Sequence, residues 1–413
     1  MYFLYNILTY CTGFFIRIVS LFNTKLQLFV KGRVSVFKTL TQLNSENKRV
    51  IWVHCASLGE FEQGRPIIER LYQDSNNFIV LSFFSPSGYE IRKNYDKAHH
   101  ITYLPLDTNS NAKCFIKTLQ PDLAIFVKYE FWPNYLRQLR RNNIRTLLVS
   151  GIFREKHSFF KNYGGWMRKS LDTFEHFFVQ DQKSKALLGG INKTNVTISG
   201  DTRFDRVYEI LQQNNTLEFI ESFKQHSDCI VYGSTWKEDH EVISDFINSS
   251  QDIKHIIAPH HIDEHAVKDI TDRIPNKRIA LFSEKDSLNL EEYDVFIINT
   301  IGILTKIYSY ADVAYVGGGF KTGLHNTLEP ATFGAPILIG PHYSKFNEAI
   351  ELVELGGIIS TNNKEEYLNH IKVLIVSSEL RKEKGLICSE FIENKKGATE
   401  IILAYLGKFL PIQ

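Results

Sequence analysis

The segment from Val316 to Ala349 reads VGGGFKTGLHNTLEPATFGAPILIGPHYSKFNEA. Three glycines follow a short apolar run, which is typical of a strand that ends in a tight turn. After Gly323, the residues 325–329 are suited to open a helix, whose free backbone N–H groups favour an anion such as a phosphate. A further strand over 336–339 leads to a second expected helix start at Asn347. The segment therefore predicts an α/β sheet with glycine loops and polar side chains gathered at one edge.

The size and composition of the chain predict two globular domains. It has 413 residues, 43% of them hydrophobic and 23% charged, which is more than one ordinary core accommodates. A net charge of +2 excludes a global polyanion binder, and we expect no nucleic-acid partner. The five cysteines are scattered without metal-ligand spacing, which suits a reducing compartment.

The amino-terminal segment predicts contact with a membrane. Residues 2–22 are almost wholly apolar or aromatic and long enough to cross a bilayer. Basic residues such as Lys25 and Arg33 follow the segment, so the positive-inside rule keeps the bulk of the protein in the cytoplasm. We expect residues 1–24 to form a single membrane anchor. Because Arg17 is costly inside a bilayer, a helix that lies on the membrane is the alternative.

Short apolar runs alternate with amphipathic stretches along the rest of the chain. The expected strands are 50–54, 78–82, 101–103, 123–127, 146–150, 176–179 and 196–199, then 229–232, 255–258, 279–281, 295–298, 313–316, 337–339 and 358–360. This alternation is typical of parallel βαβ units. We expect two Rossmann-like domains facing a cleft, over residues 25–210 and 211–413. The last helix is a candidate to pack back on the first domain.

Two motifs in the first half place charged residues at strand ends. In WVHCASLGEFEQGRP, a strand ends near His54 and Glu60 opens the next helix, where a carboxylate could take the proton of an attacking hydroxyl. The alternative is that Glu60 only stabilises the helix start. In KYEFWPN, Glu130 follows a strand directly, and the alternative to a site is an ion pair with Lys128.

Three motifs in the second half also fall at strand ends. Gly233-Ser234-Thr235 could approach a phosphate closely, or its hydroxyls could cap the next helix. The pair His260-His261 suggests a metal, but neighbouring residues of a strand point to opposite faces, so we expect no metal site. The third motif is NTIGIL at residues 299–304.

The motifs ASLGEFEQGRP, KYEFWPN, GSTW, LHNTLEPATFGAPILIGP and KFNEA together resemble the Kdo transferases, which attach 3-deoxy-manno-octulosonic acid (Kdo) to lipid A precursors. The resemblance spans roughly residues 50 to 350 and both expected domains. It implies the GT-B architecture, with catalytic roles for Glu60 as general base, Glu130 in transition-state support, and Arg203 where the family has Lys.

The resemblance also implies a substrate and CMP site. Its expected residues are Ser57, Gly59, Gly233, Ser234, Thr235, Pro259, His260, Ile301, Gly302, Ile303, Gly318, Gly319, Gly323, His325, Asn326, Thr327, Leu328, Glu329 and Asn347. In the first domain these surround the base, and in the second they hold CMP, with Glu329 on the ribose diol. His260 stands where many relatives have Arg, and Ile303 where the family has Glu, which puts those contacts in doubt.

The function implied by the resemblance is an inverting, metal-independent transfer of Kdo from CMP-Kdo to a lipid A precursor (lipid IVA), without a cofactor. It implies work at the cytoplasmic face of the bacterial inner membrane, within lipopolysaccharide biosynthesis. The alternatives are another GT-B transferase, a sugar-nucleotide epimerase, or a membrane-tethered nucleotide-binding protein without catalysis. The basic and aromatic stretch 153–169 suits an anionic lipid interface, nucleic acid, or a helix over the first core.

Overall fold

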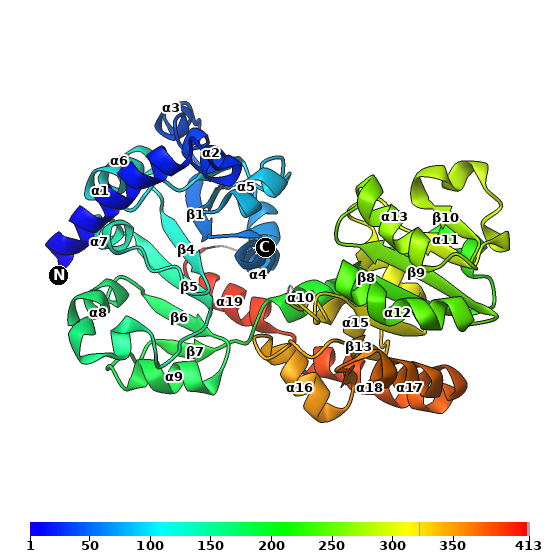
Figure 1. Cartoon of the computed structure of the whole chain (residues 1–413). Helices are drawn as coiled ribbons and strands as arrows, with labels where there is room; N and C mark the ends of the chain where they lie inside the picture. The colour runs from blue at the N-terminus through cyan, green and yellow to red at the C-terminus, as the bar shows by residue number, and fades with distance from the viewer. Residues whose placement is uncertain (322, 411–413) are drawn as a thin grey trace. The chain divides into compact units, whose positions relative to one another are not determined.

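The computed structural model divides the chain into two compact units (Figure 1). The first comprises Met1–Arg206 together with the chain from Lys396 on, and the second comprises Val207–Lys395. The structure describes residues 1–321 and 323–410; Thr322 and 411–413, which belong to the predicted second domain, lie outside the described residues. Each unit is described by itself below.

The first unit is built on a seven-stranded parallel sheet of order β3-β2-β1-β4-β5-β6-β7. Its strands are β1 (Arg49–Cys55), β2 (Asn77–Phe83), β3 (His100–Tyr103), β4 (Leu123–Val127), β5 (Arg145–Gly151), β6 (His176–Val179) and β7 (Val196–Ile198). The predicted strands of the first half are confirmed. Because every pairing is parallel, the carboxyl ends of β1 and β4, which are neighbours, meet at one edge.

Both faces of this sheet are covered by helices. Alternation along β1 puts Trp52 into the core on one face and Val53 into the core on the other. The first face is covered by α3, α6, α7, α8 and α9, and the second by α4 and α19. The helices of this unit are α1 (Tyr2–Val19), α2 (Thr24–Lys31), α3 (Val36–Leu40), α4 (Leu58–Tyr72), α5 (Pro86–Arg92), α6 (Asn109–Leu119), α7 (Pro133–Arg141), α8 (Gly165–Leu171), α9 (Gln182–Gly189) and α19 (Ala398–Leu406), with α10 (Arg203–Tyr208) at the division between the units.

The second unit repeats the same architecture, with the sheet order β10-β11-β9-β8-β12-β13-β14. Its strands are β8 (Asp228–Thr235), β9 (Ile253–Pro259), β10 (Ile279–Leu281), β11 (Val295–Ile297), β12 (Val313–Val316), β13 (Ile337–Ile339) and β14 (Ile358–Ser360). Here too the predicted strands are confirmed. The helices are α11 (Glu218–Lys224), α12 (Lys237–Ser249), α13 (Glu264–Arg273), α14 (Leu304–Ile307), α15 (Leu328–Thr332), α16 (Asn347–Leu355), α17 (Lys364–Val376) and α18 (Ser378–Lys395).

The helix expected over residues 325–329 differs from the structure. The helix α15 begins only at Leu328 and has five residues. The preceding residues bond to other partners instead: the His325 N–H donates to the Gly317 carbonyl, and the Asn326 side chain accepts from the Leu328 N–H. These bonds hold the chain before Leu328 in a loop against the end of β12.

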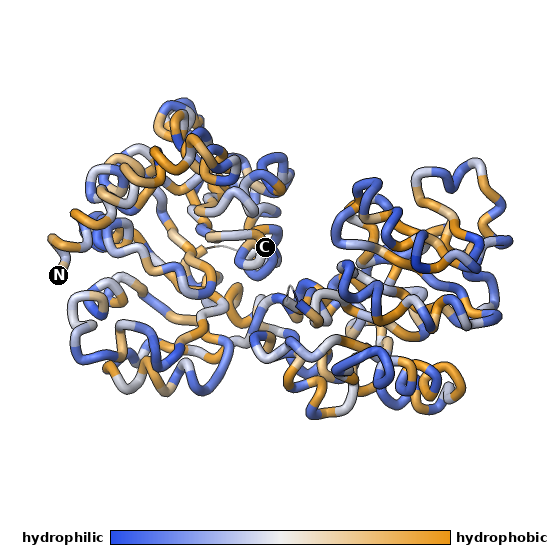
Figure 2. The backbone as a smooth tube through the Cα atoms, in the orientation of Figure 1, coloured by the Kyte–Doolittle hydropathy of each residue, from blue (hydrophilic) through white to orange (hydrophobic). Residues whose placement is uncertain are grey.

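The amino-terminal helix α1 is apolar along most of its length (Figure 2). By length and composition it is able to cross a membrane, and it is the one such helix among residues 1–321 and 323–410.

Candidate functional site

Glu60 lies at the carboxyl edge of the first sheet. The strand β1 ends at Cys55, Ser57 precedes α4, and Glu60 is the third residue of that helix. Its side chain accepts a hydrogen bond from the Ser57 hydroxyl, and the Lys128 ammonium lies 3.5 Å from its Oε1 atom. Lys128 reaches it because β4 is the neighbour of β1. With 6% of the residue exposed, Glu60 is a buried carboxylate with two polar partners.

Lys128 therefore pairs with Glu60, and the alternative of an ion pair with Glu130 is wrong. The reason is the backbone at Lys128, which has a φ of 71° directly after β4. Such a conformation is uncommon in a residue with a side chain.

Glu130 sits in a separate buried network around His54. The Trp132 indole N–H donates to Glu130 at 3.0 Å and to the His54 Nε2 atom at 3.1 Å. His54 Nε2 thus acts as an acceptor, so the ring proton lies on Nδ1, which faces the Ser82 hydroxyl at 2.9 Å. Glu130 Oε2 is 3.7 Å from His54 Nε2. Sequence reasoning missed His54 and Trp132, although both stand within the motifs that it singled out.

Arg203 is held by a carboxylate of its own loop. Its guanidinium contacts Asp201 at 2.9 Å, and the Gln63 amide of α4 donates to the same carboxylate at 3.0 Å. Asp201 is buried, which raises its pKa, but the Arg203 charge and hydrogen bonds outweigh burial and leave that pKa below its usual value. The loop is thereby fixed to the helix that carries Glu60, and the Arg203 charge is shared with Asp201.

In the second unit, the glycine loop after β12 is held by a residue that the sequence analysis did not identify. Asp239 of α12 is fully buried and accepts hydrogen bonds from the N–H groups of Gly318 and Trp236, at 2.9 and 2.8 Å, and from the Tyr315 hydroxyl at 2.7 Å. Burial raises its pKa, although the three donors favour the carboxylate. The signal was present in sequence, because an acidic residue three positions after a helix start typically bonds backward.

Several of the expected glycines are required by close packing of the backbone. A Cβ at Gly319 would lie 2.7 Å from the Gly340 nitrogen, and one at Gly233 would lie 1.8 Å from the Tyr308 hydroxyl oxygen. Gly302 and Gly323 instead adopt positive φ angles of 98° and 107° in open space. Gly319 keeps the chain after β12 close to the chain after β13, Gly233 leaves room for the Tyr308 side chain, and the second pair supplies turns.

Aromatic rings stack beside this loop. The His260 ring contacts both Trp236, at 4.3 Å between centroids, and His325, at 4.7 Å, and the Trp236 and His325 rings are 6.2 Å apart. The Trp236 indole N–H donates to His325 Nε2 at 2.9 Å. Burial lowers the pKa of His325 to about 4 and also lowers that of His260, so both are neutral near pH 7. His261 also contacts the Trp236 ring, at 4.9 Å, so the expected opposite orientation of the two histidines is wrong: β9 ends at Pro259, before them.

The cap of α12 also differs from the expected alternative. Trp236 is its N-cap residue, so neither Ser234 nor Thr235 caps the helix. Ser234 has a φ of 54°, and Thr235 is buried with its hydroxyl 2.9 Å from His240 Nε2. A hydrogen bond of 2.9 Å from the Gly317 N–H to the Gly233 carbonyl holds the segment Gly233–Trp236 next to the glycine loop.

Glu329 lies at the start of α15 and already has partners. Its carboxylate accepts from the Thr305 hydroxyl at 2.9 Å and from the Asn326 amide at 3.0 Å. Thr327 and Leu328 beside it are buried. A ribose hydroxyl would share this carboxylate with those two donors.

The remaining expected residues are placed as follows. Gly59 is exposed in the first turn of α4. Ile301 is 82% exposed, and Ile303 is half-buried before α14. Asn347 is exposed in the first turn of α16. An apolar side chain as exposed as Ile301 is accessible to a ligand.

No group of three or more His, Cys, Asp or Glu side chains that could hold a metal occurs among residues 1–321 and 323–410. The adjacent histidines instead belong to a ring cluster with Trp236 and His325.

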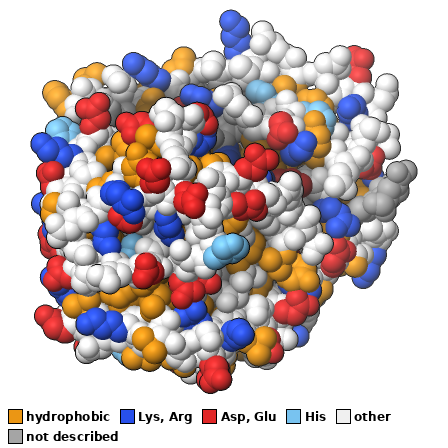
Figure 3. Space-filling view, turned by 90° about the vertical axis from the view of Figure 1, so that its right-hand side faces the viewer, with side chains coloured by type: hydrophobic (Ala, Val, Ile, Leu, Met, Phe, Trp, Pro, Cys, Tyr) orange, Lys and Arg blue, Asp and Glu red, His pale blue; other side chains and the backbone are white. Residues whose placement is uncertain are grey.

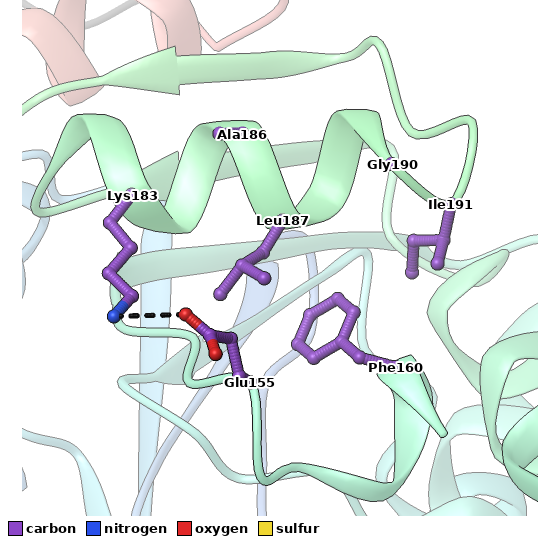
Figure 4. A pocket seen from close by; sticks show the side chains of 7 residues that line it. All are labelled: Glu155, Phe160, Lys183, Ala186, Leu187, Gly190 and Ile191. Carbon is purple, nitrogen blue, oxygen red and sulfur yellow. Dashed lines mark ion pairs between the residues drawn. The ribbon is translucent and has the colours of Figure 1, made fainter. Parts of the chain in front are cut away.

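The basic and aromatic stretch 153–169 is divided in the structure. Phe153 and Phe159 are buried in the core of the first unit, whereas Tyr163 is 66% exposed. Phe160 points with Leu187 into a cavity of about 400 Å³ below α9 (Figure 4). The cavity is apolar apart from an ion pair between Lys183 and Glu155 at 3.2 Å. Phe153 and Phe159 therefore serve the core of the first unit.

The amino-acid sequence is similar to known transferases along most of the chain. Residues 30–206 match the family model described as 3-deoxy-D-manno-octulosonic-acid transferase (kdotransferase). The 3-deoxy-D-manno-octulosonic acid transferase of Rickettsia bellii is 26% identical over 394 residues, 92% of either chain. That of Haemophilus influenzae is 27% identical over 381 residues, 87% of either chain.

The fold is similar to that of solved sugar-nucleotide enzymes. UDP-GlcNAc 2-epimerase from Neisseria meningitidis, bound to UDP-GlcNAc, superposes with a TM-score of 0.61 and 14% identity, covering 87% of this chain and all of that one. MurG from Acinetobacter baumannii gives a TM-score of 0.55 with 13% identity, covering 88% and 100%. At such identities the likeness shows the fold alone, which is the GT-B arrangement of two Rossmann-like units with parallel sheets. The family match over residues 30–206 and the similarity to 3-deoxy-D-manno-octulosonic acid transferases over about nine tenths of the sequence indicate that this chain is a glycosyltransferase similar to the Kdo transferases.

Proposed function

We propose that the protein transfers Kdo from CMP-Kdo to a lipid A precursor, lipid IVA, by an inverting and metal-independent reaction with Glu60 as general base. The observation that carries this proposal is the position of Glu60. It is a buried carboxylate at the carboxyl edge of the first sheet, where ligands of open α/β sheets bind. Its partners are one hydroxyl and one ammonium group, which hold the carboxylate in place.

In this reaction, Glu60 accepts the proton of the acceptor hydroxyl as its oxygen bonds to the anomeric carbon of Kdo. The bond from that carbon to the phosphate oxygen breaks at the same time, and CMP leaves with the electron pair. One displacement needs one base and inverts the anomeric centre. Glu130 supports the transition state from its network with His54 and Trp132, and Arg203 supplies positive charge, shared with Asp201.

The second unit is the proposed CMP site. Backbone N–H groups of the glycine loop and its neighbours stabilise the phosphate without a metal, because oriented dipoles act strongly where water is excluded. The ring cluster of Trp236, His260 and His325 gives the nucleotide a stacking surface. Since His260 is neutral near pH 7, it adds stacking and hydrogen bonding in place of the fixed charge of an arginine. The proposed ribose partner is Glu329.

The proposed place of work is the cytoplasmic face of the bacterial inner membrane, where α1 anchors the chain. The exposed apolar residues of α1 support this placement.

The test is Glu60→Gln, with Glu62→Gln as matched control. Glu62 lies on the same helix and is ion-paired to Arg92 at 2.9 Å, away from Lys128. Purified proteins are incubated with CMP-Kdo and lipid IVA, and the product is followed by mass spectrometry. Glu60→Gln should lower turnover about 10²–10⁴-fold, the usual effect of removing a general base. CMP affinity and thermal melting should stay close to wild type, as should all properties of Glu62→Gln.

Three outcomes would contradict the proposal. Turnover of Glu60→Gln close to wild type, with chemistry rate-limiting, would remove Glu60 as base and make Glu130 the next carboxylate to test. A parallel loss of melting temperature would make Glu60 a structural residue of the helix start. An unchanged acceptor with wild-type protein would favour a different sugar-nucleotide enzyme or a binding protein.

A further inference from the structure

The helix α1 turns polar residues of its first half toward the first unit and most of its apolar residues outward, the reverse of an ordinary surface helix, while Arg17 is exposed near its end. The half-buried stripe consists of Tyr2, Tyr5, Asn6, Thr9, Gly13 and Ile16. The exposed face includes Phe3, Leu4, Leu8, Phe14, Phe15 and Ile18. A contiguous apolar face of this kind marks a surface that something apolar covers.

Specific contacts hold α1 lengthwise against the unit. The Tyr5 hydroxyl donates to Asp107 at 2.7 Å, and the Asn134 amide donates to Asn6 at 3.1 Å. Two turns further on, Gly13 packs so closely that a Cβ would lie 2.9 Å from a leucine side chain of the unit. A helix that left this surface to cross a bilayer would strip these partners from Asp107 and Asn134, which are almost fully buried. The contacts therefore favour a helix that lies along the membrane.

A basic cavity opens beside the first turn of α1. Its volume is about 680 Å³, and it is bounded by α1, α7 and α8. The side chains that give it its chemical character are Tyr2, Arg137, Arg140, Arg141, Trp166 and Lys169. No carboxylate lines it among the described residues. Four cationic groups and two large aromatic rings thus share one hollow.

The positive charge of this cavity is only partly balanced. Arg140 contacts Asp172 at 3.2 Å. Arg137 stacks over the Tyr2 ring at 4.6 Å, and no ion pair is found in the described parts of the chain for Arg137, Arg141 or Lys169. Exposed basic residues gathered without acidic partners attract a phosphate.

We propose that this cavity binds the phosphate head group of an anionic membrane phospholipid, while the outer face of α1 lies against the acyl chains. Tyr2 belongs both to the cavity wall and to α1, so head group and apolar face are adjacent on one surface. Trp166 packs against Tyr5 at 5.5 Å between centroids, and tryptophan is favoured at the depth where head groups meet acyl chains.

A phospholipid fits better than a nucleic acid, because the four basic side chains of this cavity form one compact cluster. The net charge is only +2, and basic and acidic side chains are interspersed on the face drawn in Figure 3. A polyanion would need a long positive track, whereas one head group needs one hollow. The inference shares only the membrane surface with the proposed function and does not depend on the transfer reaction.

The test measures how strongly the full-length protein and a cavity variant bind to vesicles. The cavity variant combines Arg137→Gln, Arg141→Gln and Lys169→Gln. The matched control carries the same charge change at three exposed lysines of the second unit, Lys268→Gln, Lys372→Gln and Lys382→Gln. Vesicles of phosphatidylcholine alone and of phosphatidylcholine with phosphatidylglycerol are sedimented with each protein at physiological ionic strength. Thermal melting and CMP binding confirm that the variants are folded.

The cavity variant should lose affinity for the phosphatidylglycerol vesicles roughly 100-fold, the combined effect of three basic residues at an anionic surface. Its binding to phosphatidylcholine alone should match the control variant, because α1 is unchanged. Equal binding of both variants to the anionic vesicles would overturn the proposal. So would release of wild-type protein by inorganic phosphate at matched ionic strength, which would indicate a site for free phosphate. Normal vesicle binding with a raised KM for the acceptor would instead assign the cavity to the acceptor's own phosphates.

Discussion

Replacing Asp239 by alanine should release the glycine loop after β12 in the second unit. The two oxygens of this carboxylate accept from three donors on two different segments: Trp236 at the start of α12, and Tyr315 and Gly318 at the end of β12. All three bonds are 2.7–2.9 Å long, and Asp239 has no exposed surface. The substitution leaves the donors without an acceptor inside the protein.

The magnitude follows from those donors. A buried donor that loses its partner costs about 1–3 kcal/mol, so three donors cost at least about 3 kcal/mol even if water enters the space. Since 1.4 kcal/mol is a factor of ten, the equilibrium for opening this region should rise by roughly 100-fold. CMP affinity should fall as well, because the loop that carries Gly318 no longer has a fixed position.

Hydrogen exchange measured by mass spectrometry resolves the two units within the full-length protein. Peptides that span β8 and β12 should exchange roughly 100-fold faster, while those that span β1 and β4 serve as an internal reference. The matched control is Glu238→Ala, one residue earlier, where an exposed pair with Lys321 contributes at most about 1 kcal/mol. If Asp239→Ala exchanges no faster than Glu238→Ala, the carboxylate does not hold the loop and the reasoning fails.

Burial raises the pKa of Asp107 to about 7 from an unfolded value of about 3.9, so the first unit should lose stability as pH rises from about 4 to about 7. The Tyr5 hydroxyl donates to Asp107 and lowers this pKa, so Tyr5→Phe should extend the loss of stability above pH 7. Urea titrations at a series of pH values measure both effects. Gly319→Ala should destabilise the second unit by about 1–3 kcal/mol through contact with neighbouring backbone, whereas Gly165→Ala, with open space around it, should cost nothing measurable by thermal melting. His260→Arg should strengthen CMP binding at pH 7 up to about tenfold by adding a charged donor, and calorimetry that shows unchanged or weaker binding would place His260 away from the phosphate.

The strands were predictable because buried parallel strands are nearly continuous apolar runs, and each run is bounded by turn residues within a few positions. Leu123–Val127 is such a run, and its bounds in sequence and structure agree. The position of Glu60 at a sheet edge followed from the same logic, since it depends only on where β1 ends and α4 begins.

The partners of these residues were not predictable, because they come from distant parts of the chain. Lys128 is nearer in sequence to Glu130 but pairs with Glu60, since β1 and β4 are neighbours in the sheet. The sequence also predicted a helix where the structure has a loop before Leu328. The loop depends on the hydrogen bond from the His325 N–H to the Gly317 carbonyl, and this bond follows from the path of the glycine turn. The inward polar stripe of α1 was hidden for another reason: its mean hydropathy is high whichever side faces the protein.

Because the end of the chain returns to the first unit, this unit can complete its folding only after the second unit has been translated. The last helix, α19, fills one face of the first sheet with Ile402, Leu403 and Leu406, and Asp205 accepts hydrogen bonds from Gly397 and Thr399 at its start. On the ribosome, the first unit emerges with that face covered only in part, by α4, and the area that α19 covers stays exposed until the whole second unit is translated. Nascent chains are thus exposed to misassociation through this face, and a truncation just before α19 should yield a protein that depends on chaperones.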